Sequence, residues 1–419
     1  MGQGRVGMLA VLGVAAAFVV AGCGGSGGGE QGGGSESSSP TATIVSDLPL
    51  QGSSRAQQET VENAINLALQ QRGNMAGDVK INYVSQDDAT AQAGKWDEAR
   101  CAENAQSAAQ NEEIVGWIGP YNSGCAAVEI PILNQAGLAM VSHGNTAVGL
   151  TKTGGDPDEP DKYYPTGQRN YARVIVADDK QGRAAALWMR DQGVRSVYIL
   201  DDQETYGKGI ADQFQQNAQA SGIEVLGREG IDGKATNYRP LMAKIAQLNP
   251  DAIYFGGITN NNAGQLVNDK IGAGMPNERV IFMGPDGINE QAFIDAAGDA
   301  AEGVYATFAG LPPSELPGKG QEFVEQYNEN YGSGIESLTA YGYEAANVLL
   351  DAIERAYDND GEVTRAGVVR ELLATKDYNG VLGTWSFDEN GDTTLTQLSG
   401  QIVQNGKWDF DRTIDVEEG

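Results

Sequence analysis

The sequence feature that most constrains the fold is an alternation of short apolar runs with amphipathic segments along most of the chain. In the first half, apolar runs of strand length lie at 41–48, 79–85, 114–118 and 138–141. Segments with helical spacing lie between them, at 55–71, at about 96–110 and after 124. This order predicts a parallel sheet with helices on both faces and ligands bound at the carboxyl ends of the strands.

The alternation stops at a loop rich in Gly, Asp and Pro, 153–165, and then starts again. We expect further strands at 171–177, 196–201, 224–229, 252–255, 280–283 and 303–309. A helix is expected after each of the first four of these strands, at 181–192, 208–221, 238–248 and 262–271. With 419 residues, of which 40% are hydrophobic, the chain is long enough for two cores, so we predict a second doubly wound lobe.

The last third is helical at 321–331, 338–356 and 364–374, and β-like at 380–385 and 398–408. We expect the three helices to return to the first lobe. The predicted fold class is therefore α/β, with two doubly wound parallel-sheet lobes. The first lobe would comprise 41–173 and 308–385, and the second would comprise 174–307 and 386–419.

The N-terminus predicts export and a lipid anchor. Arg5 precedes an apolar run, 6–20, that is too short to span a bilayer, and Val20-Ala21-Gly22-Cys23 follows at once. This pattern resembles a bacterial lipoprotein signal, which predicts a signal peptide at 1–22 and lipidation at Cys23. The alternative is an ordinary signal peptide with an incidental cysteine. Residues 23–40, rich in Gly and Ser, predict a flexible tether at the extracytoplasmic face of the cell membrane.

The formal net charge of −29 excludes two kinds of partner. Nucleic acids and anionic lipid surfaces both bind through Lys and Arg, which are outnumbered here by acidic residues, 28 to 57. We therefore expect no nucleic acid partner and contact with the membrane only through the anchor. The acidic residues form no concentrated tail, so we attribute them to solvated helix surfaces.

Two cysteines remain in the predicted body of the protein, Cys101 within one predicted helix and Cys125 at the start of the next. In an exported protein, such a pair predicts a disulfide, and this one would stiffen the turn at Asn122 and Ser123. Two buried, unpaired thiols are the alternative.

The chain lacks the residue patterns of the common catalytic sites. His143 is its only histidine, which excludes any two-histidine metal site, and nothing in the sequence marks a serine as a nucleophile that this histidine could activate. No phosphate-binding P-loop motif occurs. We therefore expect a binding protein rather than an enzyme, with no metal and no cofactor.

Two loops of the first lobe look like the walls of a binding site. The strand 114–118 leads to Asn122 and Ser123 at the start of a helix, where free N–H groups favour a carboxylate. The strand 138–141 delivers Ser142, Gly144, Asn145 and Thr146 to the same edge of the sheet. His143, in this second loop, could act as a pH switch or be a hydrogen-bonded bystander.

Two residues of the second lobe are candidates for the opposite wall. Asp286 follows a strand and could bind an ammonium group, although Pro-Asp-Gly at 285–287 is also an ordinary turn sequence. Tyr206 lies at a strand-to-helix junction, where its ring could cover a ligand or simply pack in the core.

Taken in order, a series of short motifs resembles the type I periplasmic substrate-binding proteins of branched-chain amino acid ABC transporters. The motifs are DLPLQG at 47–52, GPYNS at 119–123, SHGNT at 142–146, LT at 150–151, YGKG at 206–209, YFGG at 254–257, GPDG at 284–287 and GTWSFD at 383–388. The resemblance covers nearly all of the chain from about residue 41 to residue 408. It implies a monomeric receptor that closes around a small molecule and then docks to permease subunits.

The resemblance also implies residue roles. Ser123, Gly144 and Thr146 become first-lobe contacts of an amino acid ligand, while Tyr206 and Asp286 close over it. Ser53 occupies a position where relatives can carry a larger aromatic residue, so the subsite for the ligand's side chain can differ here. The expected ligand-binding set is Ser53, Asn122, Ser123, Ser142, Gly144, Asn145, Thr146, Tyr206 and Asp286.

The resemblance further implies a three-crossover hinge near Arg173, Phe308 and Ser386. The expected function is binding of a branched-chain or related amino acid for an ABC importer. The alternative is a sensor of the same fold for amides, urea or other small nutrients, coupled to a regulatory partner.

Overall fold

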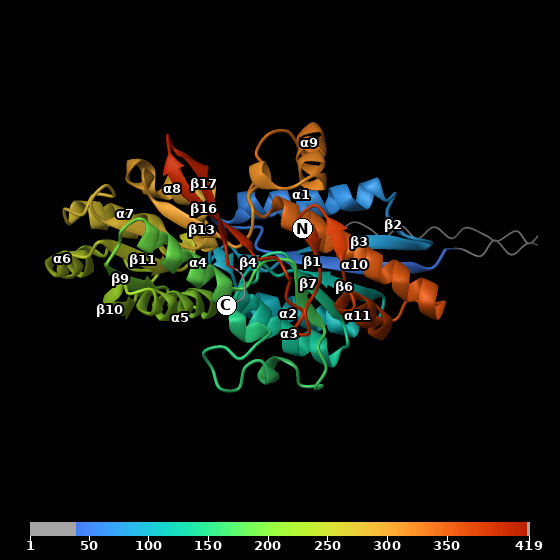
Figure 1. Ribbon diagram of the computed structural model, residues 1–419. Coiled ribbons are helices and arrows are strands. Elements are labelled where there is room, and N and C mark those ends of the chain that lie inside the picture. Colours follow the sequence, from blue (N-terminus) through green and yellow to red (C-terminus); the bar gives the residue numbers. More distant parts are fainter. Residues whose placement is uncertain (1–38, 417–419) are drawn as a thin grey trace, which may run out of the picture. The chain divides into compact units, whose positions relative to one another are not determined.

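The computed structural model describes residues 39–416 (Figure 1). The expected signal peptide, Cys23 and all but the last two residues of the expected tether lie outside the described residues. Within the described chain, the structure confirms the predicted α/β class with two mainly parallel sheets.

The first sheet has six strands in the order β2-β3-β1-β6-β7-β8. Their bounds are β1 (Thr41–Leu48), β2 (Met75–Ala76), β3 (Val79–Asp87), β6 (Ile114–Ile118), β7 (Ala139–Ser142) and β8 (Tyr171–Arg173). All neighbours from β3 to β8 pair in parallel, and only β2 is antiparallel. The central strand β1 places Ile44 opposite Tyr83 on one side and Gly116 on the other.

Helices cover both faces of this sheet, because side chains of successive strand residues point to opposite faces. Ile44 and Ile118 pack in a core with residues of α1, α9, α10 and α11, whereas Val45 and Trp117 pack with residues of α2 and α3. The bounds are α1 (Arg55–Gln71), α2 (Glu98–Gln110), α3 (Ser123–Gln135), α9 (Lys319–Tyr331), α10 (Thr339–Asp360) and α11 (Arg365–Leu373). The three late helices thus belong to the core of the first sheet.

The second sheet has seven strands in the order β10-β9-β11-β12-β13-β16-β17. It is parallel up to β13, and β16 and β17 extend it as antiparallel strands. Their bounds are β9 (Ser196–Asp201), β10 (Glu224–Gly230), β11 (Ala252–Gly256), β12 (Ile281–Gly284), β13 (Tyr305–Phe308), β16 (Gln397–Gln404) and β17 (Lys407–Asp415).

This sheet is also covered on both faces. Ile253 and Phe255 pack with α6, α7 and α8, while Ala252 and Tyr254 pack with α4 and α5. The bounds are α4 (Asp178–Asp191), α5 (Thr205–Ala220), α6 (Arg239–Leu248), α7 (Ala263–Gly272) and α8 (Gln291–Ala297). The short helix α8 was not predicted from the sequence.

The chain passes between the two sheets three times, after β8, after β13 and before β16. The amide of Val176 donates to Ala309 O at 3.2 Å, and the amide of Arg173 donates to Gly391 O at 2.9 Å. The predicted strand 171–177 is therefore wrong in its second half. Val174 to Val176 are apolar because this crossover is itself buried, not because it extends the sheet.

Two small hairpins stand outside the main sheets. One consists of β4 (Ala89–Thr90) and β5 (Lys95–Trp96), and the other of β14 (Tyr378–Gly380) and β15 (Gly383–Trp385). The first hairpin was not predicted, because two-residue strands carry no detectable period.

Three carboxyl groups are completely buried under the first sheet: those of Asp47, Asp88 and Glu129. Asn104 Nδ2 donates to Asp47 Oδ1 at 2.9 Å, and Trp117 Nε1 donates to Glu129 Oε2 at 3.0 Å. Burial raises the pKa of each carboxyl, and the charge of Asp47 raises the pKa values of Asp88 and Glu129 further. The folded protein therefore holds protons that the unfolded chain releases at a lower pH.

We expect the free energy of unfolding to fall as the pH rises from about 4.5 to about 7.5, because unfolded carboxyls ionise near pH 4. Burial raises the pKa of Glu344 to about 7 from 4.5, against hydrogen bonds from Trp385 and two backbone amides. That group alone removes about 3 kcal/mol over this range, at about 1.4 kcal/mol per unit. Asp392 has the opposite effect on the pH dependence, because its pKa is lowered to about 2 from 3.8. Its ionised form stabilises the folded protein above about pH 4, and this stabilisation is lost as the pH falls towards 2.

The measurement is urea unfolding at pH 5 and pH 8, with the same pair of measurements on Glu129→Gln. The variant should show a smaller loss of stability between the two pH values, because it lacks one titrating carboxyl. Equal or higher stability of the parent protein at pH 8 would contradict the prediction.

Candidate functional site

A small cavity lies where the carboxyl ends of strands from both sheets meet. Its lining residues are Tyr121, Asn122, Ser123, Gly144, Tyr206, Ile258 and Asp286. The first four follow β6 and β7 of the first sheet, and the other three follow β9, β11 and β12 of the second. This is the position at which parallel α/β sheets usually bind ligands.

The structure brings five of the nine expected ligand-binding residues to the lining of this cavity. Asn122, Ser123, Gly144, Tyr206 and Asp286 line it, whereas Ser53, Ser142, Asn145 and Thr146 do not. Tyr121 and Ile258 line it but were not expected. Their apolar character gives them the same sequence pattern as core residues, so only their position after a strand could have indicated them.

The first-lobe wall is the start of α3. Asn122 is the N-cap residue, and Ser123 is the first residue of the helix. Ser123 Oγ accepts a hydrogen bond from the amide of Ala147 at 3.3 Å, which ties the helix start to the neighbouring loop. The amide groups at the start of this thirteen-residue helix favour a bound carboxylate.

Ser142 and Asn145 hold the two first-lobe loops together. Ser142 Oγ accepts from the amides of Gly144 and Asn145, at 3.1 and 2.9 Å, and donates to Pro120 O at 3.0 Å. Asn145 Nδ2 donates to Tyr121 O at 2.9 Å. Because these polar groups already form hydrogen bonds within the protein, the side chains of Ser142 and Asn145 hold the cavity wall in position.

The second-lobe wall carries a buried carboxylate. Tyr206 OH donates to Asp286 Oδ1 at 2.6 Å, and the amide of Gly287 donates to Tyr206 OH at 3.1 Å. Burial raises the pKa of Asp286, although hydrogen bonds from Tyr206 and Gln181 oppose the rise. No Lys, Arg or His is among the described residues that line the cavity. A buried carboxylate without a cation is costly, so this wall is suited to an ammonium group.

Arg173 fixes the loop behind the cavity. Its side chain is fully buried and its Nε lies 2.7 Å from Asp392 Oδ1. The guanidinium also donates to Ala147 O at 2.8 Å and to Thr151 Oγ1 at 2.6 Å. Burial opposes ionisation of Asp392, but the charges and hydrogen bonds of Arg173 and Lys152 together outweigh it and lower the pKa of that carboxyl to about 2. Arg173 thus connects the loop that contains Ala147 to the third crossover, the segment before β16 that contains Asp392.

His143 is buried and lies outside the cavity lining. Its Nε2 is 3.0 Å from Gln58 Oε1, and burial lowers its pKa to about 3. The ring therefore stays neutral near neutral pH, which favours the hydrogen-bonded bystander over the pH switch.

Cys101 of α2 and Cys125 of α3 form a disulfide. It joins the two helices within the first turn of α3, beside the cavity. The sulfur atoms lie near the carboxyls of Asp88 and Glu129, but bonded sulfurs are not thiolate metal ligands.

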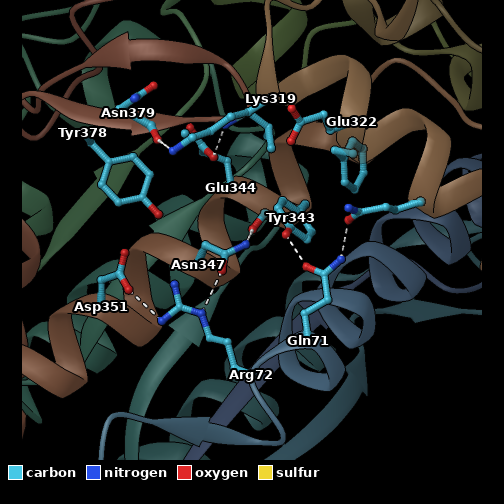
Figure 2. Close-up of a pocket in the computed structure, with 14 residues that line it drawn as sticks. Gln71, Arg72, Lys319, Glu322, Tyr343, Glu344, Asn347, Asp351, Tyr378 and Asn379 are labelled. Atoms are coloured by element: carbon cyan, nitrogen blue, oxygen red, sulfur yellow. Dashed lines mark hydrogen bonds and ion pairs between the residues drawn. The ribbon is translucent and has the colours of Figure 1, made fainter.

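A larger hollow lies elsewhere on the first lobe, between the end of α1, helices α9 and α10, and β14. Several of its charged and amide groups are paired with one another: Arg72 with Asp351 at 2.6 Å, as Figure 2 shows, and Gln71 with Gln326 at 2.6 Å. Because these groups already satisfy each other, the cavity between the sheets is the better candidate site.

Among residues 39–416, no helix combines the length and the apolar character that a bilayer span requires.

Comparison with known proteins agrees with this fold. The family model described as "Periplasmic binding protein" matches residues 43–406. The Leu/Ile/Val-binding protein homolog 2 of Brucella abortus is 28% identical over 375 residues, covering 86% of this chain and 91% of that protein.

Two solved structures share the fold. The leucine-binding protein LivK of Thermotoga maritima superposes with a TM-score of 0.77 at 26% identity, covering 89% of this chain and 99% of that one. A solute-binding protein of R. palustris in complex with benzoate superposes with a TM-score of 0.73 at 18% identity, covering 90% and 98%. The second likeness concerns the fold alone.

Proposed function

The chain belongs to the periplasmic binding protein family and is of the branched-chain amino acid ABC transporter type, and on this premise we propose that it is the extracytoplasmic receptor of an importer. It binds a branched-chain or related amino acid in the cavity between the lobes, closes by hinge motion at the three crossovers and delivers the ligand to permease subunits. Cys23 carries the lipid anchor, and the receptor acts as a monomer.

The observation that carries the proposal is the pairing of opposite walls. The start of α3 at Ser123 offers amide groups to a carboxylate, and Asp286 with Tyr206 offers a buried acceptor to an ammonium group. An α-amino acid presents both groups on one carbon atom. Benzoate has no ammonium group to neutralise Asp286, so the charge distribution favours a zwitterion.

A thermal-shift panel tests this function. We expect leucine, isoleucine or valine to raise the Tm by several degrees, because a ligand at about 100 times its Kd adds about 2.7 kcal/mol to the free energy of unfolding. The panel also contains other amino acids, amides, urea and aromatic acids. No shift with any of the three branched-chain amino acids would exclude that ligand class, and a shift with benzoate alone would exclude the zwitterion.

A further inference from the structure

The hairpin β4–β5 is fixed to the first lobe beside the cavity. Asp87 anchors its base: Oδ1 accepts from the amide of Ala89 at 2.9 Å, and Oδ2 accepts from Gln51 Nε2 at 2.7 Å. The Trp96 ring packs on Gly124, where an added Cβ would lie 2.4 Å from Trp96 Cζ2. Gly124 directly follows Ser123, so the hairpin supports the helix start that faces the cavity.

The tip of the same hairpin contacts the second lobe. Lys95 Nζ forms an ion pair with Glu204 and donates to Asn261 Oδ1 at 2.8 Å. Trp96 Nε1 donates to the other carboxylate oxygen of Glu204 at 3.2 Å. Asn260 Nδ2 donates to Gly94 O at 2.5 Å. All these bonds join the hairpin of the first lobe to loops of the second lobe.

The second-lobe partners of the hairpin are held as one unit by Asp202. Its carboxylate accepts from the amides of Glu204 and Ile258, at 3.0 and 3.3 Å, and from Asn261 Nδ2 at 2.8 Å. Ile258 lines the cavity, and Glu204 lies two residues before Tyr206. Through Glu204 and Asn261, Lys95 is therefore connected to loops that carry two residues of the second-lobe wall.

The ion pair is partly buried, with side-chain exposures of 20% for Lys95 and 22% for Glu204. Partial burial weakens screening by salt relative to a fully exposed pair. The partners of each bond belong to different lobes, so an opening motion that separates the hairpin from these loops would break the bonds.

We propose that Lys95, Trp96 and Glu204 form a clasp across the cleft that sets the lifetime of the closed state. Glu204 is the positioning residue: it links the hairpin that supports Ser123 to the helix that carries Tyr206. The inference rests on the proposed function in one respect, namely that the lobes open and close around a ligand.

The test compares Glu204→Gln, Lys95→Met and the double variant with the parent chain. Spin labels on Gln110→Cys and Gln219→Cys, both exposed and on different lobes, report the distance between lobes with and without L-leucine. Each single variant should reduce the ratio of the short-distance to the long-distance population about five- to tenfold, which is the low end of typical coupling between two sites. The double variant should add little more, because both substitutions remove the same contact.

Lys162→Met is the matched control, since Lys162 pairs with Asp156 at 2.8 Å within one loop of the first lobe. It should leave the distance distribution unchanged. Where L-leucine binds, its dissociation should quicken by the same factor in the clasp variants, with little change in the association rate.

Distance distributions equal to that of the parent in both clasp variants would overturn the proposal. A parent protein that shows only the long distance in every condition would overturn it as well. Failure of the proposed function looks different: no amino acid would shift the Tm, while the ligand-free distance distributions would still respond to the clasp variants.

Discussion

Replacing Asp286 by asparagine is expected to weaken amino acid binding by about a hundredfold or more, because removing one partner of a buried charge pair costs about 2–5 kcal/mol. The carboxylate is 4% exposed and accepts a hydrogen bond from Tyr206. The asparagine keeps the volume of the side chain but cannot neutralise an ammonium group. Isothermal titration with L-leucine, or with the amino acid that gives the largest thermal shift, measures the loss.

Two controls separate charge from structure in this experiment. Tyr206→Phe removes one hydrogen bond to Asp286 and should weaken binding only about fivefold, as expected for a contact worth about 1 kcal/mol. The Tm of ligand-free Asp286→Asn should equal or exceed that of the parent, because burial already raises the pKa of this carboxyl. Retained affinity in Asp286→Asn would return the residue to the role of a turn residue.

Replacing Arg173 by methionine is expected to lower the free energy of unfolding by about 3–5 kcal/mol, the usual cost of leaving one member of a buried ion pair alone. Arg173 is fully buried, and its loss would leave the Asp392 carboxylate in the interior with only Lys152 as a charged partner. It would also release the carbonyl of Ala147 in the binding loop. Urea unfolding at pH 7 gives the magnitude.

The matched control is Arg190→Met, whose partner Asp191 forms an exposed pair at 3.2 Å with exposures of 51% and 52%. This change should cost less than about 1 kcal/mol. The double variant Arg173→Met with Asp392→Leu should recover part of the lost stability, because no unpaired charge then remains. Equal effects of Arg173→Met and Arg190→Met would show that burial of the ion pair is unimportant.

Local patterns predicted most of the elements correctly. The strand at 41–48, the helix at 55–71 and the strand at 114–118 have the predicted bounds. Apolar periodicity and cap residues are local properties, so they can be read without knowledge of the fold. The predicted strand 171–177 is too long because an apolar crossover and an apolar strand share one pattern.

The candidate site was predictable where residues follow the carboxyl end of a strand. Ser123, Gly144, Tyr206 and Asp286 were expected on that ground and lie together in one cavity. Ile258 and Tyr121 were missed because an apolar residue beside a ligand has no local signature that distinguishes it from the core. The roles of Ser142 and Asn145 in holding the loops depend on partners more than twenty residues away.

The sequence by itself determined the α/β class, the alternation that builds two parallel sheets and the acidic residue opposite a helix start. These features follow from the spacing of apolar side chains, from turn residues and from charge, all of which can be read within a few consecutive residues. Only the tertiary structure decided that Arg173 holds the binding loop, that His143 is buried away from the cavity and that Lys95 reaches Glu204 across the cleft. Those contacts join residues brought together by packing of whole helices and sheets, and no local pattern records such packing.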